Sequence, residues 1–534
     1  MATPETVESR TPAVPSLASP EPTAASRGGS LRIGLGSNPR SIDPRFADDQ
    51  DGLLVVDALF DSLTRHDGEL TPVPSAAIAW RVSEDARTWT FTLDSQATFH
   101  DGSLVSASDF VRAFQRIADG RATPRSFQAH LLRDVVGWAE AQAKGVPLAG
   151  VRSTSLGEFE IQLLRPNADL ADILVHPSLA PVPSGADERP GWASSPVGNG
   201  PFAMAEPWAP NQFIRLVRAS SRPVLDEVLF RIYADDLGNA RQFLDFEAGQ
   251  LHVAQVPSGS LVAALEQYGS AGDGADGAGV IDGAWATTYD YGFDTTRAPF
   301  DVAEVRQAVS LLIDRERIAS EVMLGTRDAA TGLLPLGLLG AEPRTCPWCR
   351  FAPEEARQLL EDAGIVLDPE VIGPLVLIHN QGSTHAQIAA LIATSITAEL
   401  GLELEVRELG LQEYAQALRN HEGHLFRMGW TSEHPMASSY LEPIFATSSL
   451  GGDNVTGFSD LQTDQLLRQS ASTLERSERV LLGQQVQQRV AQLAPLAPVL
   501  DYRLYRVVDL RVRDFVMNPM ARVDLARVSL VPAS

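Results

Sequence analysis

The feature of the sequence that most restricts its fold is an alternation of strand and helix patterns between residues 375 and 420. Apolar runs at 375–379 and 402–408 have the length and composition of buried strands. The segments that follow them, 385–400 and 412–420, carry apolar residues at helical spacing. A strand–helix–strand–helix order requires crossover connections, which build a parallel sheet covered by helices. The sequence therefore predicts an α/β fold with a parallel, doubly wound sheet here.

The first half of the chain is dominated instead by short strands. They are predicted at 31–36, twice within 80–93, as a hairpin at 151–164, and across 202–232. Helical spacing predicts helices at 52–63 and 109–118, with Ser108 as the N-cap of the second. A loop-rich stretch at 181–200 marks a crossing between structural units.

The charge of the chain excludes several functions. Its 534 residues contain 68 Asp and Glu against 43 Lys and Arg, a net charge of −25. A surface this acidic repels phosphate backbones, so nucleic-acid binding is not expected. Lys144 is the one lysine of the chain and lies in no phosphate-binding loop, which removes the usual basis for P-loop and Schiff-base chemistry.

The first thirty residues predict a disordered tether. They are rich in Pro, Ala, Ser and Thr and lack an apolar signal core. A tether suggests a lipid anchor or a membrane segment that this chain does not contain; the alternative is a disordered tail or a cloning artefact. The sequence contains no run of about 18 apolar residues that could form a transmembrane helix.

Cys346 and Cys349 are the two cysteines of the chain. Two thiols cannot close a four-ligand zinc site, and no histidine lies at zinc-finger spacing. The pair follows loop sequence rich in Gly and Pro, so a small disulfide that pins a loop is favoured over free thiols or a redox pair. A disulfide indicates an extracytoplasmic location.

No catalytic or metal-binding motif stands out. His100 and Asp101 are neighbours, but no Ser or Cys nucleophile in an elbow motif accompanies them. The spacing of the histidines at 379, 385, 421, 424 and 434 matches no closed metal motif. We therefore expect no metal, no cofactor and no enzymatic activity, and keep a hydrolase only as an alternative.

Several short motifs occur in a fixed order along the chain. They are LRIG at 31–34, SIDP at 41–44, WTFTL at 89–93, FHDGS at 99–103, SASDF at 106–110, PVGNGPF at 196–202, LDEVLFRI at 225–232, FDVAEVRQAVS at 300–310, IDR at 313–315 and GW at 429–430. Their order and spacing resemble the family 5 solute-binding proteins of ABC importers, the oligopeptide- and dipeptide-binding type. The resemblance covers about residues 31–525.

The resemblance implies a two-lobed periplasmic-binding-protein fold of type II, with an extra inserted subdomain in the first lobe. A hinge joins the lobes, and the ligand is enclosed between them. Fitted to this sequence, lobe I comprises residues 31–50, 189–288 and 499–534, the inserted subdomain residues 51–188, and lobe II residues 289–498.

The resemblance also implies ligand-binding positions around 429–437. In the peptide-binding branch an acidic residue after the Gly-Trp pair binds the ligand's amino terminus, and Glu433 occupies that position, where the family commonly has Asp. A desolvated ammonium needs such an anion. Trp430 is expected to form the floor of the pocket by stacking or cation–π contact, with His434 beside it. Each of these has a structural alternative, as a loop charge or a core side chain.

Weaker candidates lie elsewhere in the chain. Some dipeptide binders have an arginine that binds the ligand carboxylate near the loop after the 375–379 strand. This chain has Asn380 and Gln381 there and no arginine, which favours a longer ligand or one with an uncharged end. Ser37 and Asn38, after the first strand, and Trp285, Tyr289 and Tyr291, near the lobe junction, complete the set. For each of these five residues a structural role is favoured over ligand binding.

The sequence thus predicts a monomeric extracytoplasmic carrier that captures a peptide and delivers it to an ABC transporter permease. It would reach the membrane through an N-terminal anchor alone. A second hypothesis keeps the fold but changes the solute to a sugar, opine, metal chelate or signalling metabolite. A third makes the chain a sensor module that partners a membrane protein.

Overall fold

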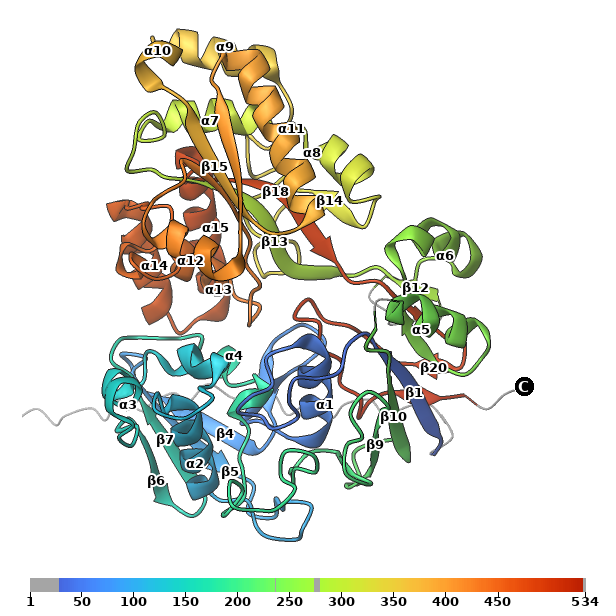
Figure 1. Ribbon diagram of the computed structural model, residues 1–534. Coiled ribbons are helices and arrows are strands. Elements are labelled where there is room, and N and C mark those ends of the chain that lie inside the picture. Colours follow the sequence, from blue (N-terminus) through green and yellow to red (C-terminus); the bar gives the residue numbers. More distant parts are fainter. Residues whose placement is uncertain (1–27, 236, 273–278, 532–534) are drawn as a thin grey trace, which may run out of the picture.

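The molecule consists of two halves that face each other. The computed structural model describes residues 28–235, 237–272 and 279–531, so the tether expected at 1–30 lies almost wholly outside the described residues. Figure 1 shows an upper half, formed by the elements from β13 to β18, above a lower half that contains the other described elements. Within the described residues, no helix is both long and apolar enough to cross a membrane.

A seven-stranded mixed sheet forms one side of the lower half. Its order is β12 (Gly279–Ile281), β19 (Arg506–Val508), β11 (Val253–Gln255), β1 (Ser30–Leu35), β10 (Glu227–Ile232), β9 (Phe213–Arg218) and β8 (Phe202–Met204). β1 runs parallel to both of its neighbours, β10 and β11. Helices α1 (Gln50–Leu59), α5 (Gly238–Glu247) and α6 (Leu261–Tyr268), the turn η3 (Ser258–Ser260) and the small pair β20 (Val512–Arg513) and β21 (Ser529–Leu530) belong to this part.

A four-stranded antiparallel unit forms the other side of the lower half. Its sheet order is β4 (Ala77–Val82), β5 (Thr88–Leu93), β7 (Glu158–Gln162) and β6 (Val151–Ser155), and the pair β2 (Thr64–His66) and β3 (Pro72–Pro74) precedes it. The remaining elements of this four-stranded unit are α2 (Ala107–Ala118), η1 (Phe127–Leu132), α3 (Trp138–Lys144), α4 (Leu170–Ile173) and η2 (Pro177–Leu179). Its core is continuous with that of the seven-stranded sheet.

The start of α2 differs from the sequence prediction. Ser106, not Ser108, is the N-cap, because Ser106 forms a capping box with Asp109. The backbone N–H of Ser106 donates to the Asp109 carboxylate at 2.8 Å, and its hydroxyl donates to the same oxygen at 2.7 Å. The carboxylate at the third helical position decides which serine caps the helix.

A six-stranded mixed sheet forms the centre of the upper half. Its order is β14 (Arg327–Ala329), β18 (Leu496–Arg503), β13 (Ala284–Phe293), β17 (Leu425–Met428), β15 (Leu375–Asn380) and β16 (Leu404–Leu409). The predicted parallel pairing is confirmed where β15 meets β16 and β17. The rest of the sheet is antiparallel, since β13 is antiparallel to both β17 and β18, and β14 to β18.

Helices cover both faces of this sheet, as the doubly wound pattern predicts. One face packs against α7 (Ala303–Leu311), α9 (Pro353–Asp362) and α11 (Ser383–Leu400), and the other against α12 (Leu411–Arg419), α13 (Ser438–Phe445), α14 (Leu461–Ser472) and α15 (Arg476–Leu493). Shorter elements are α8 (Arg315–Arg317), η4 (Ile318–Val322), α10 (Pro369–Ile372) and η5 (Thr447–Ser449).

The chain crosses between the halves at the paired strands β13 and β18. β12 ends at Ile281 and β13 begins at Ala284, while β18 ends at Arg503 and β19 begins at Arg506. Figure 1 shows both long strands running side by side out of the upper half toward the seven-stranded sheet. At the crossing, the Arg503 guanidinium donates to the Asp328 carboxylate at 2.5 Å and to the carbonyl of Asp282 at 2.7 Å.

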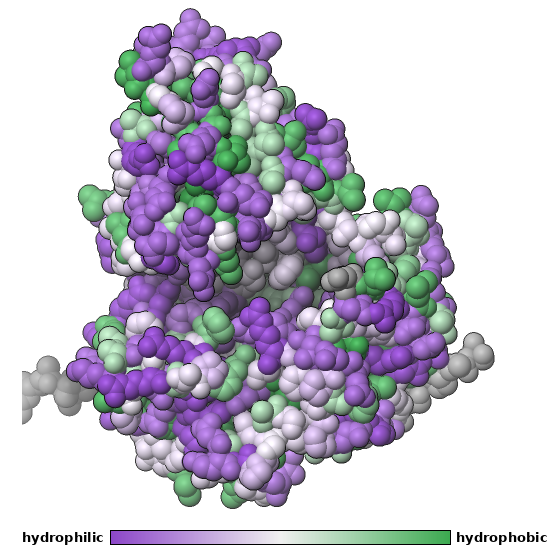
Figure 2. Space-filling view, in the orientation of Figure 1, coloured by the Kyte–Doolittle hydropathy of each residue, from purple (hydrophilic) through white to green (hydrophobic). Residues whose placement is uncertain are grey.

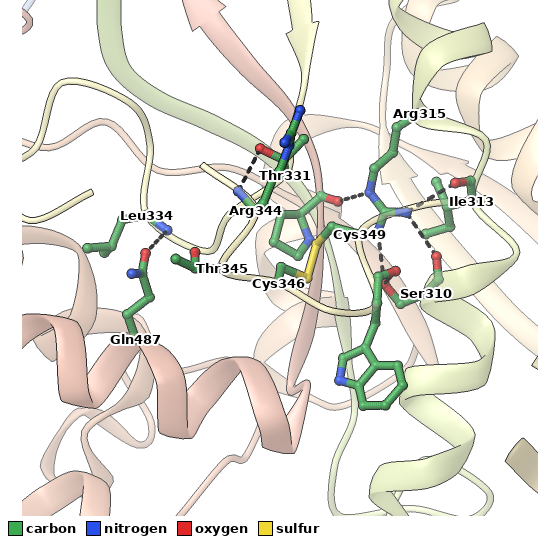
Figure 3. The surroundings of a disulfide bond; sticks show 12 residues. Ser310, Ile313, Arg315, Thr331, Leu334, Arg344, Thr345, Cys346, Cys349 and Gln487 are labelled. Atoms are coloured by element: carbon green, nitrogen blue, oxygen red, sulfur yellow. Dashed lines mark hydrogen bonds between the residues drawn. A yellow bond between two sulfur atoms is a disulfide. The ribbon is translucent and has the colours of Figure 1, made fainter. Parts of the chain in front are cut away.

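The predicted disulfide is present between Cys346 and Cys349, whose Cα atoms are 5.3 Å apart. The loop around it is bound to its surroundings by hydrogen bonds, some of which appear in Figure 3. Cys346 N–H donates to the carbonyl of Thr331 at 3.1 Å, and the Ser310 hydroxyl donates to the carbonyl of Trp348 at 3.0 Å. The disulfide therefore closes a loop that is fastened to the end of α7.

Candidate functional site

A cavity of about 80 Å³ lies where the four-stranded unit meets the upper half. Its lower wall includes His130, Arg165 and Asp169, and its upper wall includes Trp430, Glu433 and His434. Figure 2 shows that the molecular surface is hollowed where the two halves face each other. Trp430, Glu433 and His434, which the sequence predicted as one group, therefore lie together in a cavity between the halves.

The segment that carries these three residues is held firmly to the sheet. After β17 ends at Met428, the chain runs beside β13: the carbonyl of Trp430 accepts from Thr288 N–H at 2.9 Å, and Ser432 N–H donates to the carbonyl of Ala286 at 2.8 Å. The indole N–H of Trp430 donates to the carbonyl of Ser439 at 2.8 Å. These bonds fix where the side chains enter the cavity.

Glu433 contacts the opposite half through His130. His130 Nε2 lies 2.7 Å from Glu433 Oε1, and the two side chains are 48% and 32% exposed. The contact joins η1 of the four-stranded unit to the loop after β17. An anionic side chain with this exposure can bind a cation and still be reached from solvent.

His434 is buried, and its Nδ1 has no hydrogen-bond partner within the described part of the chain. Buried polar atoms nearly always have partners, so an orphan atom in a cavity wall marks a position where a ligand or water supplies one. Trp430 next to it is partly buried and packs on the core of the upper half with part of its ring.

Ion pairs connect the halves on this side of the molecule. Asp169 binds Arg479 at 2.7 Å, with each side chain 5% exposed, and also accepts from the Ser438 hydroxyl at 2.5 Å. Asp172 binds Arg476 at 2.7 Å. We call Asp169–Arg479 and Asp172–Arg476 the interface ion pairs. Both join residues around α4 to α15, so the four-stranded unit is docked on the upper half.

Asn380 and Gln381 lie at the end of β15, outside the cavity wall. Gln381 is exposed, and Asn380 is partly buried with its Oδ1 buried and unpartnered in the described structure. Ligands of open α/β sheets bind outside the carboxyl ends of the strands. The parallel strands β15 and β17 have their carboxyl ends at the same edge of the sheet.

Ser37 and Asn38 make structural contacts in the lower half. The backbone N–H and hydroxyl of Ser37 donate to Asp51 at 2.9 and 3.0 Å, and the side-chain carbonyl of Asn38 accepts from Asn211 N–H at 2.8 Å. Burial, opposed by the charge of Arg506 and by the bonds from Ser37, raises the pKa of Asp51 above its usual value.

The aromatic candidates of β13 lie in packed surroundings. Trp285 packs edge-to-face on Tyr502 with ring centroids 5.7 Å apart. Tyr289 is 1% exposed and its hydroxyl lies 3.1 Å from His385 Nδ1, while the Arg427 guanidinium lies 4.8 Å from its ring centroid. Burial raises the pKa of Tyr289 to about 12, so the phenol stays neutral.

The sequence does not point to His130 or Arg427 as binding residues, and it shows His385 only among histidines that match no metal motif. Arg427 lies on β17, three residues before Trp430, and its Nε is buried with no partner in the described residues. Burial, assisted by the charge of Arg427, lowers the pKa of His385 to about 4, so this ring is neutral. Arg427 could have been proposed from its spacing to Trp430; no local signal connects His130 to Glu433.

The arrangement suits binding rather than catalysis. It provides a carboxylate, a buried ring nitrogen and an indole around a cavity between the two halves, which is the geometry of a binding site. Among the described residues, no group of three or more His, Cys, Asp or Glu side chains is placed to hold a metal ion.

Comparison with known protein families identifies the family to which this chain belongs. The family model described as "Bacterial extracellular solute-binding proteins, family 5 Middle" matches residues 71–452. The chain belongs to this family. Family 5 proteins bind small solutes for ABC transporters, so membership confirms the predicted family and the prediction of a binding protein rather than an enzyme.

Individual family 5 proteins are similar over almost the whole chain. The probable deoxycholate-binding periplasmic protein YgiS of Escherichia coli is 27% identical, covering 90% of each chain. The periplasmic oligopeptide-binding protein OppA of Salmonella typhimurium is 26% identical, covering 89% of this chain and 87% of its own. The unliganded open form of the murein tripeptide-binding protein MppA superimposes with a TM-score of 0.81 at 22% identity. The match covers 95% of this chain and 98% of MppA, which confirms the predicted fold.

Proposed function

We propose that the protein captures a peptide by its amino terminus, between the four-stranded unit and the upper half, and delivers it to an ABC transporter permease. The observation that carries the proposal is the convergence of Trp430, Glu433 and His434 on one cavity walled by both halves. A ligand that contacts both walls stabilises the closed arrangement.

The three side chains divide the recognition of an amino terminus among them. Glu433 Oε1 pairs with His130 Nε2 in this structure and supplies the anion for the ammonium of the ligand. The unpartnered Nδ1 of His434 offers a further hydrogen bond. The indole of Trp430 offers a face to the first side chain of the peptide.

The proposed motion is a closure of two lobes about the crossings of the chain near 281–284 and 503–506. Lobe I would comprise residues 31–50, 189–288 and 499–534, with the insertion 51–188, and lobe II residues 289–498. β13 begins before residue 289 and β18 ends after 498, so the hinge would lie a few residues outside those bounds.

A second solute class has one observation in its favour. A relative that is 27% identical is named a probable deoxycholate-binding protein, and deoxycholate has no amino terminus. The loop at Asn380 and Gln381 carries no arginine that could bind the carboxylate of a dipeptide, which argues against a strict dipeptide specificity. We therefore propose peptides of three or more residues and keep a non-peptide solute as the alternative.

The proposed setting is extracytoplasmic. The disulfide, the periplasmic relatives and the family description support it. We propose a monomer anchored through its N-terminal segment, which lies outside the described residues.

Thermal unfolding with solute panels tests the proposal. Trialanine and longer peptides should raise the melting temperature, since a ligand that binds the native state stabilises it. Glu433→Gln should weaken trialanine binding at least roughly tenfold, because a hydrogen bond to a charged group contributes about 1.5–3 kcal/mol. Glu413→Gln, an exposed acid of α12, is the matched control. Stabilisation by bile acids or sugars and by no peptide would contradict the peptide proposal.

A further inference from the structure

The side chain of His130 pairs with the carboxylate of Glu433, the group that the proposed function assigns to the ligand. It reaches Glu433 from the other half of the molecule, across a separation of 303 residues in sequence. Both side chains remain partly exposed, at 48% and 32%, so the contact lies at the accessible side of the cavity. It can break without disrupting a hydrophobic core.

The hydrogen bonds of His130 require a charged ring. Its Nε2 faces a carboxylate oxygen of Glu433 at 2.7 Å, and its Nδ1 faces the carbonyl oxygen of Phe127 at 2.8 Å. Both oxygens only accept hydrogen bonds, so each ring nitrogen must carry a proton. Burial lowers the pKa of His130, but the hydrogen bond and the charge of Glu433 outweigh it and hold the pKa above the usual value.

The other ionisable groups around this contact mostly have partners of their own. They are Arg133 and Asp134 beside η1, Arg165 and Asp169 before α4, His176 at η2, His434 beside Glu433, Glu442 on α13, and Arg522, whose pKa responds to Glu433. Arg165 binds Asp134 and Glu442, and Asp169 binds Arg479. Arg133 repels a charged His130, and Glu433 provides the opposing attraction.

We propose that protonated His130 is a built-in competitor for the amine subsite, which occupies Glu433 until a ligand ammonium displaces it. The inference rests on the proposed role of Glu433. Two cations at one carboxylate repel each other, so binding of the ammonium favours departure or deprotonation of the imidazolium. Ligand capture and protonation of His130 therefore oppose each other.

The competition sets a pH window for capture. Below the pKa of His130, affinity for an amine-terminated ligand falls by up to about tenfold per pH unit, since one proton must be released. By linkage, a bound ligand lowers the pKa of His130 to the same extent. Above about pH 8 the ligand's own α-amino group loses its proton, so affinity falls on that side too. The plot of ligand affinity against pH is therefore expected to be bell-shaped.

Calorimetric titration of the full chain with trialanine from pH 5 to pH 9 tests the inference. His130→Asn removes the charge and should abolish the acid limb of the profile while keeping the alkaline limb. His421→Asn is the matched control, because His421 pairs with Asp294 at 3.2 Å within the upper half. In the same series, NMR titration of the His130 ring should show a lower pKa with trialanine bound, and no change with N-acetyl-trialanine.

The outcomes separate the two proposals. An acid limb lost in His130→Asn and kept in His421→Asn supports the competition. An acid limb that persists unchanged in His130→Asn overturns the competition and leaves peptide capture standing. Absence of trialanine binding at every pH, in the native chain and in His130→Asn alike, overturns the proposed function and the competition with it.

Discussion

At the scale of single residues, the candidate site is marked by hydrogen bonds that are not completed. Asn380 Oδ1, Arg427 Nε and His434 Nδ1 are buried atoms without partners in the described structure. Asn380 ends β15, Arg427 lies on β17, and His434 follows β17 closely. Such atoms raise the free energy of the unliganded protein. Of the three, His434 lies in the cavity wall, where a ligand can supply the missing hydrogen bond.

Replacing His434 should separate stability from binding. His434→Leu removes an unpartnered buried atom, so we expect the free energy of unfolding to stay within about 1 kcal/mol of the native value or to rise. Trialanine binding should weaken at least tenfold. His176→Leu is the control: His176 Nδ1 accepts from Ser178 N–H at 3.2 Å, so its loss should destabilise by about 1–3 kcal/mol. Urea unfolding and calorimetry measure both quantities; equal destabilisation by the two variants would contradict the assignment.

At the scale of elements, the sequence predicts what local spacing controls. The strand–helix alternation after residue 375 gives β15, α11, β16 and α12 and their parallel pairing, because crossover connections are short and local. Local spacing does not predict the antiparallel pairing of β13 with β18, since these strands are more than 200 residues apart and pair only through tertiary structure. The capping serine of α2 lies two residues before the predicted one, because the cap depends on its acidic partner Asp109.

The paired strands β13 and β18 carry an acidic pair that should make stability depend on pH. Asp290 and Asp501 are buried, and burial raises their pKa values to about 7 and about 8, with mutual repulsion adding to the second. Because these pKa values lie above the unfolded value of 3.8, the native state holds the extra protons. The contribution to stability is complete below about pH 4 and is lost as pH rises through about 7–8.

Asp290→Asn imitates the protonated carboxyl and tests this dependence. The difference in unfolding free energy between the variant and the native protein should grow in favour of the variant between pH 5 and pH 9, on the order of a few kcal/mol. Urea unfolding at each pH measures it. Glu413→Gln, at an exposed position, should show no such trend. A difference that is flat with pH would mean that Asp290 is ionised throughout.

At the scale of the whole molecule, the site depends on contacts that no local pattern reveals. Trp430, Glu433 and His434 are neighbours in sequence, so their proximity was predictable. His130 and Asp169 come from the other half, and their partners Glu433 and Arg479 follow more than 300 residues later. Their pairing depends on how the two halves pack together, which periodicity and propensity do not encode.

The interface ion pairs should determine how firmly the halves are docked. Arg479→Met leaves Asp169 buried without its cation, so we expect a loss of about 3–5 kcal/mol in the free energy of the docked state. Hydrogen exchange should accelerate at residues 165–175 and in α15, and the seven-stranded sheet should keep its protection. Arg489→Met is the control, because Arg489 binds Asp460 within the upper half with 32% of its side chain exposed, where a pair contributes about 1 kcal/mol or less. If both variants change exchange at 165–175 equally, the Asp169–Arg479 pair does not hold the halves together.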